Sequence, residues 1–347
     1  MAFSTLTNFQ IKGISTCVPP KRVSNLEDVA DINPGDLRKV VAMAGVEHRY
    51  VSDGSITSTD LCRHACAYLL ESTGWSPDSV DALILVTQSP DYFLPSSSCL
   101  VHRDLGFPTS TAAFDVGQGC SGYPYGQWLG AMMLNTGLSR VILLHGETSS
   151  LFCHPEDYAT LLLFGDAGSA TALEKGRDTD VAHFSLHTDG RGYADLIVPG
   201  RGFRNSFPEN ERDHHLYMNG PNIFTFSISR VPSIIEELLT RTNLTRDDID
   251  YFVLHQSNRF IMKHLAKKCA LDLNRVPIIL EEFGNAGGPS IPLTITRGIA
   301  PLESTARLMT IGYGVGLSWS GSLFDLEPEV PLTHSVFDHS IPAREGP

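Results

Sequence analysis

Two stretches of this 347-residue chain decide its fold: SPDSVDALILVTQSPDYF at 76–93 and TRDDIDYFVLHQSNRF at 245–260. Each consists of a short acidic turn, a hydrophobic run, and a Gln-Ser pair at the end of that run. Apolar runs of this length, bounded by turn residues, are typical of buried strands. Gln88 and Gln256 therefore occupy corresponding positions, and we interpret the two stretches as copies of one strand unit.

The correspondence continues beyond the two strands. Cys120 lies 32 residues after Gln88, and Asn285 lies 29 residues after Gln256. Cys120 sits in the glycine-rich turn GQGCSG (117–122), and Asn285 sits in the glycine-rich turn FGNAGG (283–288). Each turn leads into a helical pattern and then into a further strand, RVILLHGE (140–147) after Cys120 and ARLMTIGYG (306–314) after Asn285. Chance similarity between generic strand–turn–helix units is the alternative. Three matched features in the same order favour two duplicated halves, joined near 175–180.

Strand-like and helix-like patterns alternate along the chain. The expected strands are 82–88, 112–116, 140–147, 251–256 and 307–314, and the expected helices are 58–73, 97–105, 122–136, 222–241 and 258–269. Such alternation predicts an α/β fold with largely parallel pairing. We interpret the polar segment 200–222 as a surface excursion. We expect the proline-rich residues after Phe324 to form a tail that lies on the surface or frays.

The charge balance narrows the function classes. Lys and Arg total 26 and Asp and Glu total 39, which gives a net charge of −13. This balance argues against nucleic acid and anionic membranes as partners, because both attract clustered Lys and Arg. No apolar run reaches the about 18–20 residues of a membrane span, and the start MAFSTLTNFQIKG does not resemble a signal peptide. We expect a cytoplasmic protein.

Seven scattered cysteines do not form a disulfide framework. Cys62 and Cys66 are four residues apart, with His64 between them, which leaves a metal site as one interpretation. Both lie in an apolar helical pattern, and no second pair with ligand spacing accompanies them. The preferred interpretation is two small core residues, so we expect no metal.

Cys120 is the cysteine with a local signature. It follows an apolar strand and a glycine turn and precedes a helical pattern. The helix dipole and nearby backbone N–H groups are expected to stabilise its thiolate, which is the nucleophilic form. A buried structural thiol is the alternative from this pattern alone.

His255 and Asn285 are the expected partners of this thiol. A lone histidine at a strand end is more often structural than catalytic, so the selection of His255 depends on Asn285, 30 residues later. An asparagine cannot act as a base, but it can donate hydrogen bonds from a fixed position. Ligand sites lie at the carboxyl ends of strands in open α/β sheets. A pseudo-two-fold arrangement of the halves would bring all three residues to one cleft.

Four motifs in this chain together resemble those of the β-ketoacyl-acyl-carrier-protein synthase III family. They are AFDVGQGCSG around Cys120, GDAGSA (165–170), HQSNRF from His255, and GNAGG around Asn285. The block GYGVGLSWSGSL (312–323) also resembles the glycine-rich closing strand of that family. The resemblance covers about residues 8–325.

The resemblance implies a thiolase-like fold of two duplicated α/β halves in five αβαβα layers, usually as a homodimer. The halves would span 1–175, with Cys120, and 176–325, with His255 and Asn285, followed by a tail at 326–347. No cofactor is implied.

The resemblance also implies a reaction, the decarboxylative condensation of an acyl primer with a malonyl thioester. Cys120 would carry the acyl group, and the backbone N–H groups of Cys120, Val315 and Gly316 would stabilise the oxyanion. His255 and Asn285 would hydrogen-bond the carbonyl of malonyl-ACP or malonyl-CoA. Gly165 and Asp166, in GDAGSA, are expected to be structural.

The primer and its donor are less closely implied. Phe93 and Leu94 lie in a loop that in the family reaches the acyl pocket of the partner subunit; ordinary dimer packing is the alternative. Lys39 and Met43 stand where the family usually has the Trp and Arg that clamp coenzyme A. Both acyl-CoA and acyl-ACP remain open as donors, and the missing clamp favours acyl-carrier protein or a differently bound thioester.

An acidic carrier protein needs a local basic patch on this acidic chain. The expected helix 258–269 supplies one, and family members often dock the carrier protein near this helix; its basic residues are Arg259, Lys263, Lys267 and Lys268. A solvated helix face is the alternative.

Two further functions compete with condensation. One is an acyltransferase on the same fold that passes the acyl group to an alcohol or amine, which calls for a base, often a carboxylate, in place of Asn285. The other is a non-catalytic partner subunit, which commonly lacks the nucleophile. The presence of Cys120, His255 and Asn285 favours condensation over both.

Overall fold

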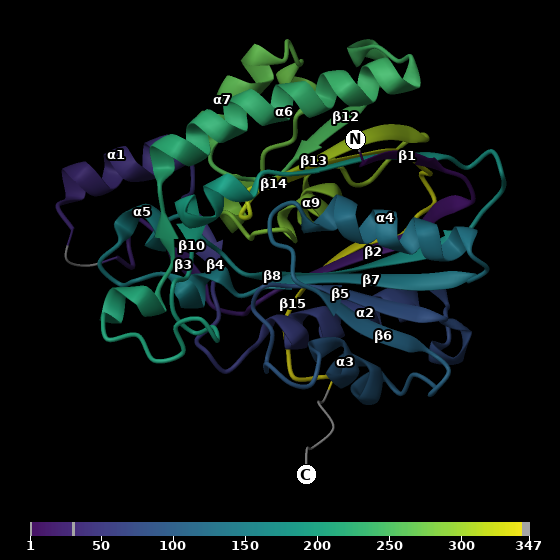
Figure 1. The fold of residues 1–347 in the computed structure, drawn as a ribbon, viewed down its shortest axis with the longest axis horizontal. Coiled ribbons are helices and arrows are strands. Elements are labelled where there is room, and N and C mark those ends of the chain that lie inside the picture. Colours follow the sequence, from purple (N-terminus) through teal and green to yellow (C-terminus); the bar gives the residue numbers. More distant parts are fainter. Residues whose placement is uncertain (1, 30–31, 342–347) are drawn as a thin grey trace.

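Two β-sheets form the framework of the chain, whose computed structural model describes residues 2–29 and 32–341 (Figure 1). One sheet has the order β15-β2-β8-β7-β5-β6, formed by Leu332–Val336, Phe9–Val18, Ala167–Lys175, Arg140–Glu147, Ala82–Val86 and Ala112–Val116. The other has the order β1-β9-β14-β13-β12, formed by Ala2–Leu6, Ala182–Thr188, Ser318–Leu326, Ala306–Gly314 and Tyr251–Leu254. Two small ribbons pair β3 with β4 and β10 with β11, formed by Arg22–Ser24, His48–Tyr50, Leu196–Ile197 and Tyr217–Met218.

The strand order confirms the duplication expected from the sequence. The run β2-β8-β7-β5 corresponds to β9-β14-β13-β12. In both runs the first two pairings are antiparallel and the third is parallel. β5 and β12, which contain the similar apolar runs within 76–93 and 245–260, therefore occupy equivalent positions in the two sheets.

Helices cover both outer faces and fill the space between the sheets, which gives five layers (Figure 1). α2 (Ser58–Thr73) and α3 (Ser97–Leu105) pack on the outer face of the six-stranded sheet. α6 (Gly220–Thr242) and α7 (Arg259–Lys268) cover the five-stranded sheet. The middle layer contains α4 (Gly122–Asn135), which contacts β7 and β14, and α9 (Ser290–Thr294), which contacts β8 and β13. Three further helices are α1 (Pro34–Ala44), α5 (Tyr158–Leu161) and α8 (Leu280–Phe283).

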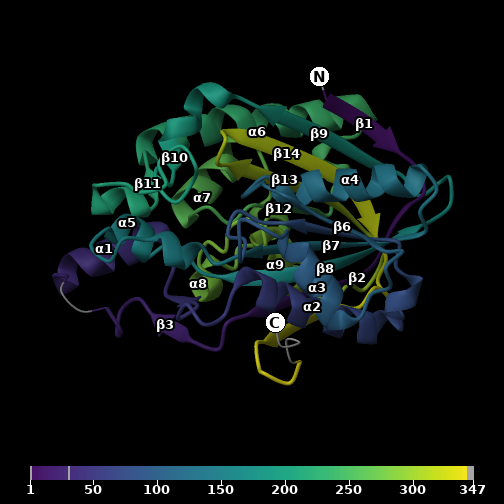
Figure 2. The ribbon, with the colours of Figure 1, turned by 60° about the horizontal axis from the view of Figure 1, so that its bottom comes forward.

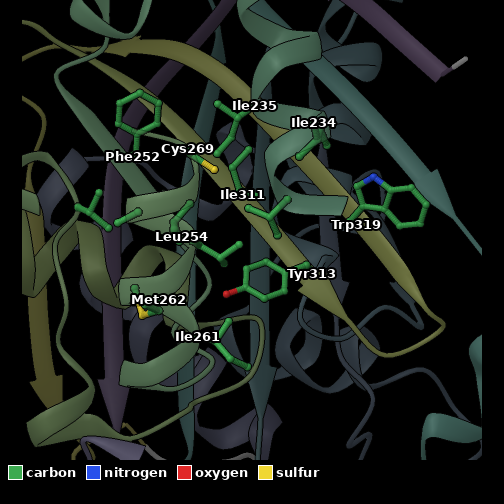
Figure 3. Close-up of a cluster of buried hydrophobic side chains, with 14 of the residues drawn as sticks. Ile234, Ile235, Phe252, Leu254, Ile261, Met262, Cys269, Ile311, Tyr313 and Trp319 are labelled. Carbon is green, nitrogen blue, oxygen red and sulfur yellow. The ribbon is translucent and has the colours of Figure 1, made fainter. Parts of the chain in front are cut away.

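Each helical layer is held by its own apolar cluster. Under α6 and α7, apolar side chains from β12, β13 and β14 pack together, among them Phe252, Ile311 and Trp319 (Figure 3). A second cluster lies between the sheets, and a third lies under α2. Cys62 and Cys66 are fully buried in the third cluster, which confirms their interpretation as core residues.

The two ends of the chain exchange sheets. β1 pairs with β9 in the sheet built mainly from the second half (Figure 2). β15 pairs with β2 in the sheet of the first half. From the sequence, we expect the residues after Phe324 to lie on the surface or fray. Leu332–Val336 do not fray but form a strand at the edge of the sheet, because the edge of β2 offers backbone partners that a local sequence pattern does not reveal. Residues 342–347 of that expected tail lie outside the described residues, and the domain boundaries stay a prediction.

The segment between β10 and β11 confirms the expected surface excursion. Phe203 and Phe207 are 90% and 94% exposed there. Among residues 2–29 and 32–341, no helix has the length and apolarity needed to cross a membrane.

Candidate active site

Cys120 lies in the turn between β6 and α4, where neighbouring chains approach too closely for most side chains. A Cβ on Gly119 would overlap the side chain of Gln88, and a Cβ on Gly122 would lie 2.5 Å from Val86. Because glycine has no side chain, the turn can closely approach these neighbouring residues. The thiol is thereby held just before the first turn of α4.

A second turn, after β13, faces this thiol. A Cβ on Gly314 would lie 3.0 Å from the sulfur of Cys120, and φ of Gly314 is +156°. The N–H groups of Val315 and of Cys120 itself both hydrogen-bond the sulfur and lower its pKa. Ser318 Oγ lies 2.6 Å from Ser121 Oγ and so ties the two turns together. Two of the three backbone donors that the resemblance implies for an oxyanion, those of Cys120 and Val315, therefore contact the sulfur, and Gly316 lines the cavity beside it.

Burial nevertheless dominates the ionisation of Cys120. Withdrawal from water raises the pKa of its thiol to about 12, and the charge of Glu147 acts in the same direction. The hydrogen bonds from Val315 and Cys120 oppose this only in part. The sequence-based expectation of a stabilised thiolate is therefore wrong in its net result, because desolvation of the charged form outweighs the backbone donors.

His255 lies at the end of β12 and is 2% exposed. Its Nδ1 lies 2.9 Å from Ser290 Oγ, and its ring packs edge-to-face on Tyr313 with centroids 5.4 Å apart. Burial lowers the pKa of His255 to about 4, and a hydrogen bond with the Gly287 backbone opposes this in part. The imidazole is therefore neutral at pH 7 and can donate through one nitrogen only.

Asn285 is fixed on both sides by backbone and side-chain bonds. Its N–H donates to Leu163 O at 2.9 Å, and its carbonyl accepts from Gly165 at 3.0 Å. Its side-chain oxygen accepts from the Gly287 N–H at 2.9 Å, and its amide nitrogen donates to Ser257 O at 3.3 Å. Since the amide nitrogen carries two hydrogens, one remains to donate to a ligand.

Tyr313 connects the three expected catalytic residues. Its ring packs on His255, and its hydroxyl lies 2.8 Å from Ser257 Oγ, in the residue whose carbonyl accepts from Asn285. Burial is the main cause that raises the pKa of Tyr313, and the charge of Cys120 acts in the same direction. His255 thus contacts this buried ring directly, Asn285 is linked to it through Ser257, and Cys120 lies near enough to affect its ionisation.

A cavity of about 820 Å³ opens over Cys120. Gly287, Val315 and Gly316 line it beside the thiol, and the apolar part of its wall includes Leu151, Phe152, Phe164, Leu196, Ile197, Val198 and Leu216. Phe93 also lines it, whereas Leu94 is 86% exposed and lies outside the lining. The cavity suits an apolar acyl group attached to the sulfur.

Family models and relatives identify the family to which the chain belongs. The model of the 3-oxoacyl-[acyl-carrier-protein] synthase III C terminal matches residues 239–326, and the 3-oxoacyl-[acyl-carrier-protein] synthase III model matches residues 114–190. The β-ketoacyl-[acyl-carrier-protein] synthase III of Clostridium tetani is 31% identical over 338 residues, which are 92% of this chain and 99% of the relative. A Campylobacter jejuni relative is 33% identical over 334 residues, with 92% and 94% covered. The chain belongs to the 3-oxoacyl-[acyl-carrier-protein] synthase III family.

The structure is also similar to solved members of this family. The 3-oxoacyl-(acyl-carrier protein) synthase from Burkholderia xenovorans LB400 superposes with a TM-score of 0.93 at 38% identity, over 96% of this chain and 99% of that one. The expected thiolase-like α/β fold is confirmed. The chain is therefore an acyltransferase of the synthase III family.

Two buried titratable residues at the end of β7 were missed by sequence reasoning. Glu147 lines the cavity and accepts hydrogen bonds from Gln88 N at 2.9 Å and Ser89 Oγ at 3.0 Å. Burial raises the pKa of Glu147 to about 8. His145 is fully buried, its ring nitrogens have no hydrogen-bond partner within the described chain, and burial lowers its pKa to about 3. The sequence feature that could have revealed them is the polar His-Gly-Glu end of the otherwise apolar run RVILLHGE (140–147).

Asp166 has the structural role that the sequence suggested. Its carboxylate accepts from the N–H groups of Ser52 at 2.7 Å and Ser150 at 2.9 Å. It thereby ties together the loops that follow β4 and β7.

The expected basic face of α7 is partly occupied by internal contacts. Arg259 pairs with Glu281 at 3.0 Å, and Lys268 donates to the Ile228 carbonyl at 2.7 Å. Lys263 and Lys267 are exposed. On α1, Lys39 pairs with Asp36 at 3.0 Å, and Met43 is 63% exposed.

Proposed function

We propose that this synthase III homologue condenses an acyl primer, held on Cys120, with a malonyl thioester to give a β-ketoacyl product and carbon dioxide. The observation that carries the proposal is the position of Cys120. Cys120 lines an apolar cavity, and its sulfur accepts a hydrogen bond from the Val315 N–H. Tyr313, whose ionisation Cys120 affects, links it to the neutral donors His255, by ring packing, and Asn285, through Ser257.

In the first step, the sulfur of Cys120 attacks the carbonyl carbon of the primer thioester. A bond forms between that carbon and Cys120, the bond to the carrier sulfur breaks, and the thiol proton leaves with the carrier thiol. The oxyanion of the tetrahedral intermediate is held by the N–H groups of Cys120, Val315 and Gly316.

In the second step, the malonyl thioester binds with its carbonyl oxygen towards His255 and Asn285. The bond to the carboxylate breaks, carbon dioxide leaves, and the electron pair forms an enolate whose oxygen accepts the two hydrogen bonds. The enolate carbon attacks the acyl carbonyl, and Cys120 leaves as a thiolate. Two neutral donors suit this step, because a fixed negative charge beside the enolate would oppose it.

Transfer to an alcohol or amine is the competing function, and Glu147 is the carboxyl group that would serve as its base. The raised pKa of Glu147, about 8, favours its protonated form at pH 7. The position where such a transferase often has a carboxylate holds Asn285, so condensation is the function that we propose.

The proposed substrates are an acyl-CoA or acyl-ACP primer and malonyl-ACP or malonyl-CoA. Phe93 is 71% exposed and lies with its ring centroid 5.4 Å from that of Phe203. An exposed aromatic pair beside the cavity is consistent with a homodimer in which this edge, with Leu94, contacts the acyl pocket of the partner subunit.

Intact-protein mass spectrometry with a panel of acyl-CoA and acyl-ACP thioesters tests the proposal. We expect one acyl adduct, lost in Cys120→Ala and retained in Cys99→Ala, which removes an exposed cysteine. His255→Ala and Asn285→Ala should keep the adduct but release carbon dioxide from malonyl-ACP about 100- to 1000-fold more slowly, since each removes one oxyanion donor. An adduct elsewhere, or a product formed without loss of carbon dioxide, would refute condensation.

A further inference from the structure

The hydroxyl of Ser290 is the side-chain partner of the catalytic histidine. Ser290 is 1% exposed at the start of α9, and its Oγ lies 2.9 Å from Nδ1 of His255. The same oxygen lies 3.3 Å from the backbone nitrogen of Gln256. One buried oxygen atom thus serves both the ring of His255 and the peptide group that follows it.

The chemistry of these groups fixes the direction of both hydrogen bonds. A backbone N–H can only donate, so Ser290 Oγ accepts from Gln256. A serine hydroxyl has one hydrogen, and among the described residues Nδ1 of His255 is the remaining partner of this oxygen. If Nδ1 also donated, the hydroxyl hydrogen would be buried without an acceptor, which is costly. The hydroxyl therefore donates to Nδ1.

We propose that Ser290 is a positioning residue that holds neutral His255 in the tautomer with its hydrogen on Nε2. This inference rests on the proposed condensation, where Nε2–H donates to the malonyl thioester carbonyl. During decarboxylation, the bond to the carboxylate breaks and the electron pair moves towards that oxygen. The hydrogen stays on Nε2 throughout, so His255 acts as a donor and no proton is transferred.

Ser290 is the side chain that hydrogen-bonds Nδ1 of the ring, and the Gly287 backbone also forms a hydrogen bond with His255. Tyr313 packs edge-to-face on the imidazole and holds its plane without occupying a ring nitrogen. Ser290 itself is held by its N–H, which donates to Gly287 O at 3.2 Å, and by its carbonyl, which accepts from Thr294 Oγ1 at 2.7 Å. The hydroxyl is therefore presented to Nδ1 from a fixed backbone.

Nitrogen-15 NMR of the histidine rings tests the tautomer directly. In the wild-type protein we expect the shift of a hydrogen-bearing nitrogen at Nε2 of His255 and of a bare nitrogen at Nδ1, assigned by loss of the signal in His255→Gln. Ser290→Ala should convert this to a mixture of tautomers, and Ser290→Thr, which keeps the hydroxyl, should restore the wild-type shifts. A protonated Nδ1 in the wild type, or unchanged shifts in Ser290→Ala, would overturn the proposal.

Kinetics supply the second measurement. Loss of one hydrogen bond of ordinary strength should lower kcat for malonyl decarboxylation about 3- to 10-fold in Ser290→Ala, with formation of the Cys120 adduct unchanged. Ser227→Ala is the matched control, because it removes a buried serine hydroxyl on α6 that donates to Ile223 O and does not contact His255 or Ser290. If Ser290→Ala and Ser227→Ala slow decarboxylation equally, the role of Ser290 is merely structural. If the wild-type protein decarboxylates no malonyl thioester, the proposed function fails, while the NMR result still decides the tautomer.

Discussion

The Glu147→Gln variant tests whether a buried, neutral carboxyl group borders the nucleophile. Glu147 is 3% exposed, and burial raises its pKa from the ordinary value of 4.5 to about 8. Glutamine has nearly the same shape and keeps an oxygen for the Gln88 N–H, which now donates to Glu147 at 2.9 Å. It removes the ability to ionise, so the pH dependence of stability isolates the charge.

The sign and size of the effect follow from the pKa. Below pH 4.5 the carboxyl is protonated in both folded and unfolded chains, so its ionisation costs the folded state nothing. As the pH rises from 4.5 through about 8, the unfolded chain ionises first and the folded state loses stability relative to it. At about 1.4 kcal/mol per pH unit, the loss approaches at most about 5 kcal/mol above pH 8. The Glu147→Gln variant should not show this loss of stability.

Urea denaturation of the wild type and the variant at pH 5, 7 and 9 measures this difference. We expect similar free energies of unfolding at pH 5 and a variant that is increasingly the more stable of the two at pH 7 and 9. Because the charge of Glu147 also raises the pKa of Cys120, the variant should react faster with iodoacetamide at pH 9. Glu71→Gln, at an exposed position of α2, is the control. A constant stability difference across pH would refute a raised pKa at Glu147.

Two further predictions concern packing and docking. Gly288→Ala should lower the free energy of unfolding, measured by urea denaturation, by about 1–3 kcal/mol, because its Cβ would overlap the buried ring of His145. Gly117→Ala is the control, since its Cβ would meet open space. Equal stability of the two variants would contradict the overlap. The double reversal K267E/K268E should raise the apparent KM for malonyl-ACP, since it reverses charge on the proposed docking face. Steady-state kinetics at low salt measure this KM, and K21E/K175E, which changes the net charge equally, is the control. An equal rise of KM in both double variants would show an unspecific charge effect and contradict docking on this face.

Local patterns predicted the elements whose burial is uniform. β5 is apolar along its whole length and fully buried, so its apolar run indicates a strand without knowledge of its neighbours. α2 repeats Leu61, Ala65 and Leu69 on one face, and the structure has the helix at Ser58–Thr73 as expected. The motif positions Cys120 and His255 were found because strand, turn and helix follow each other directly in sequence.

β14 shows why local sequence patterns did not predict other parts of the fold. Ser318, Ser320 and Ser322 are buried on the face towards α4, a position where a sequence pattern leads one to expect apolar residues. Ser320 donates to the Ser121 carbonyl and Ser322 to the Gln127 side chain, both at 2.6 Å. The polarity of this strand is matched by polar groups of a helix almost 200 residues away. Local patterns also did not predict the terminal strands β1 and β15, because their hydrogen-bonding partners β9 and β2 come from the opposite half of the chain.

The residues missed around Cys120 change the interpretation of the site itself. The sequence favoured a charged thiolate, but burial favours the neutral forms of Cys120, His255, His145 and Glu147 at pH 7. In the proposed reaction, the negative charge develops on the substrate, and the N–H groups of Val315, Asn285 and His255 would be the fixed dipoles that stabilise it. Dipoles that are already oriented stabilise a developing charge without reorganisation. A protein charge beside the enolate would bias the ground state as well, so neutrality at pH 7 lets the donors act mainly on the transition state.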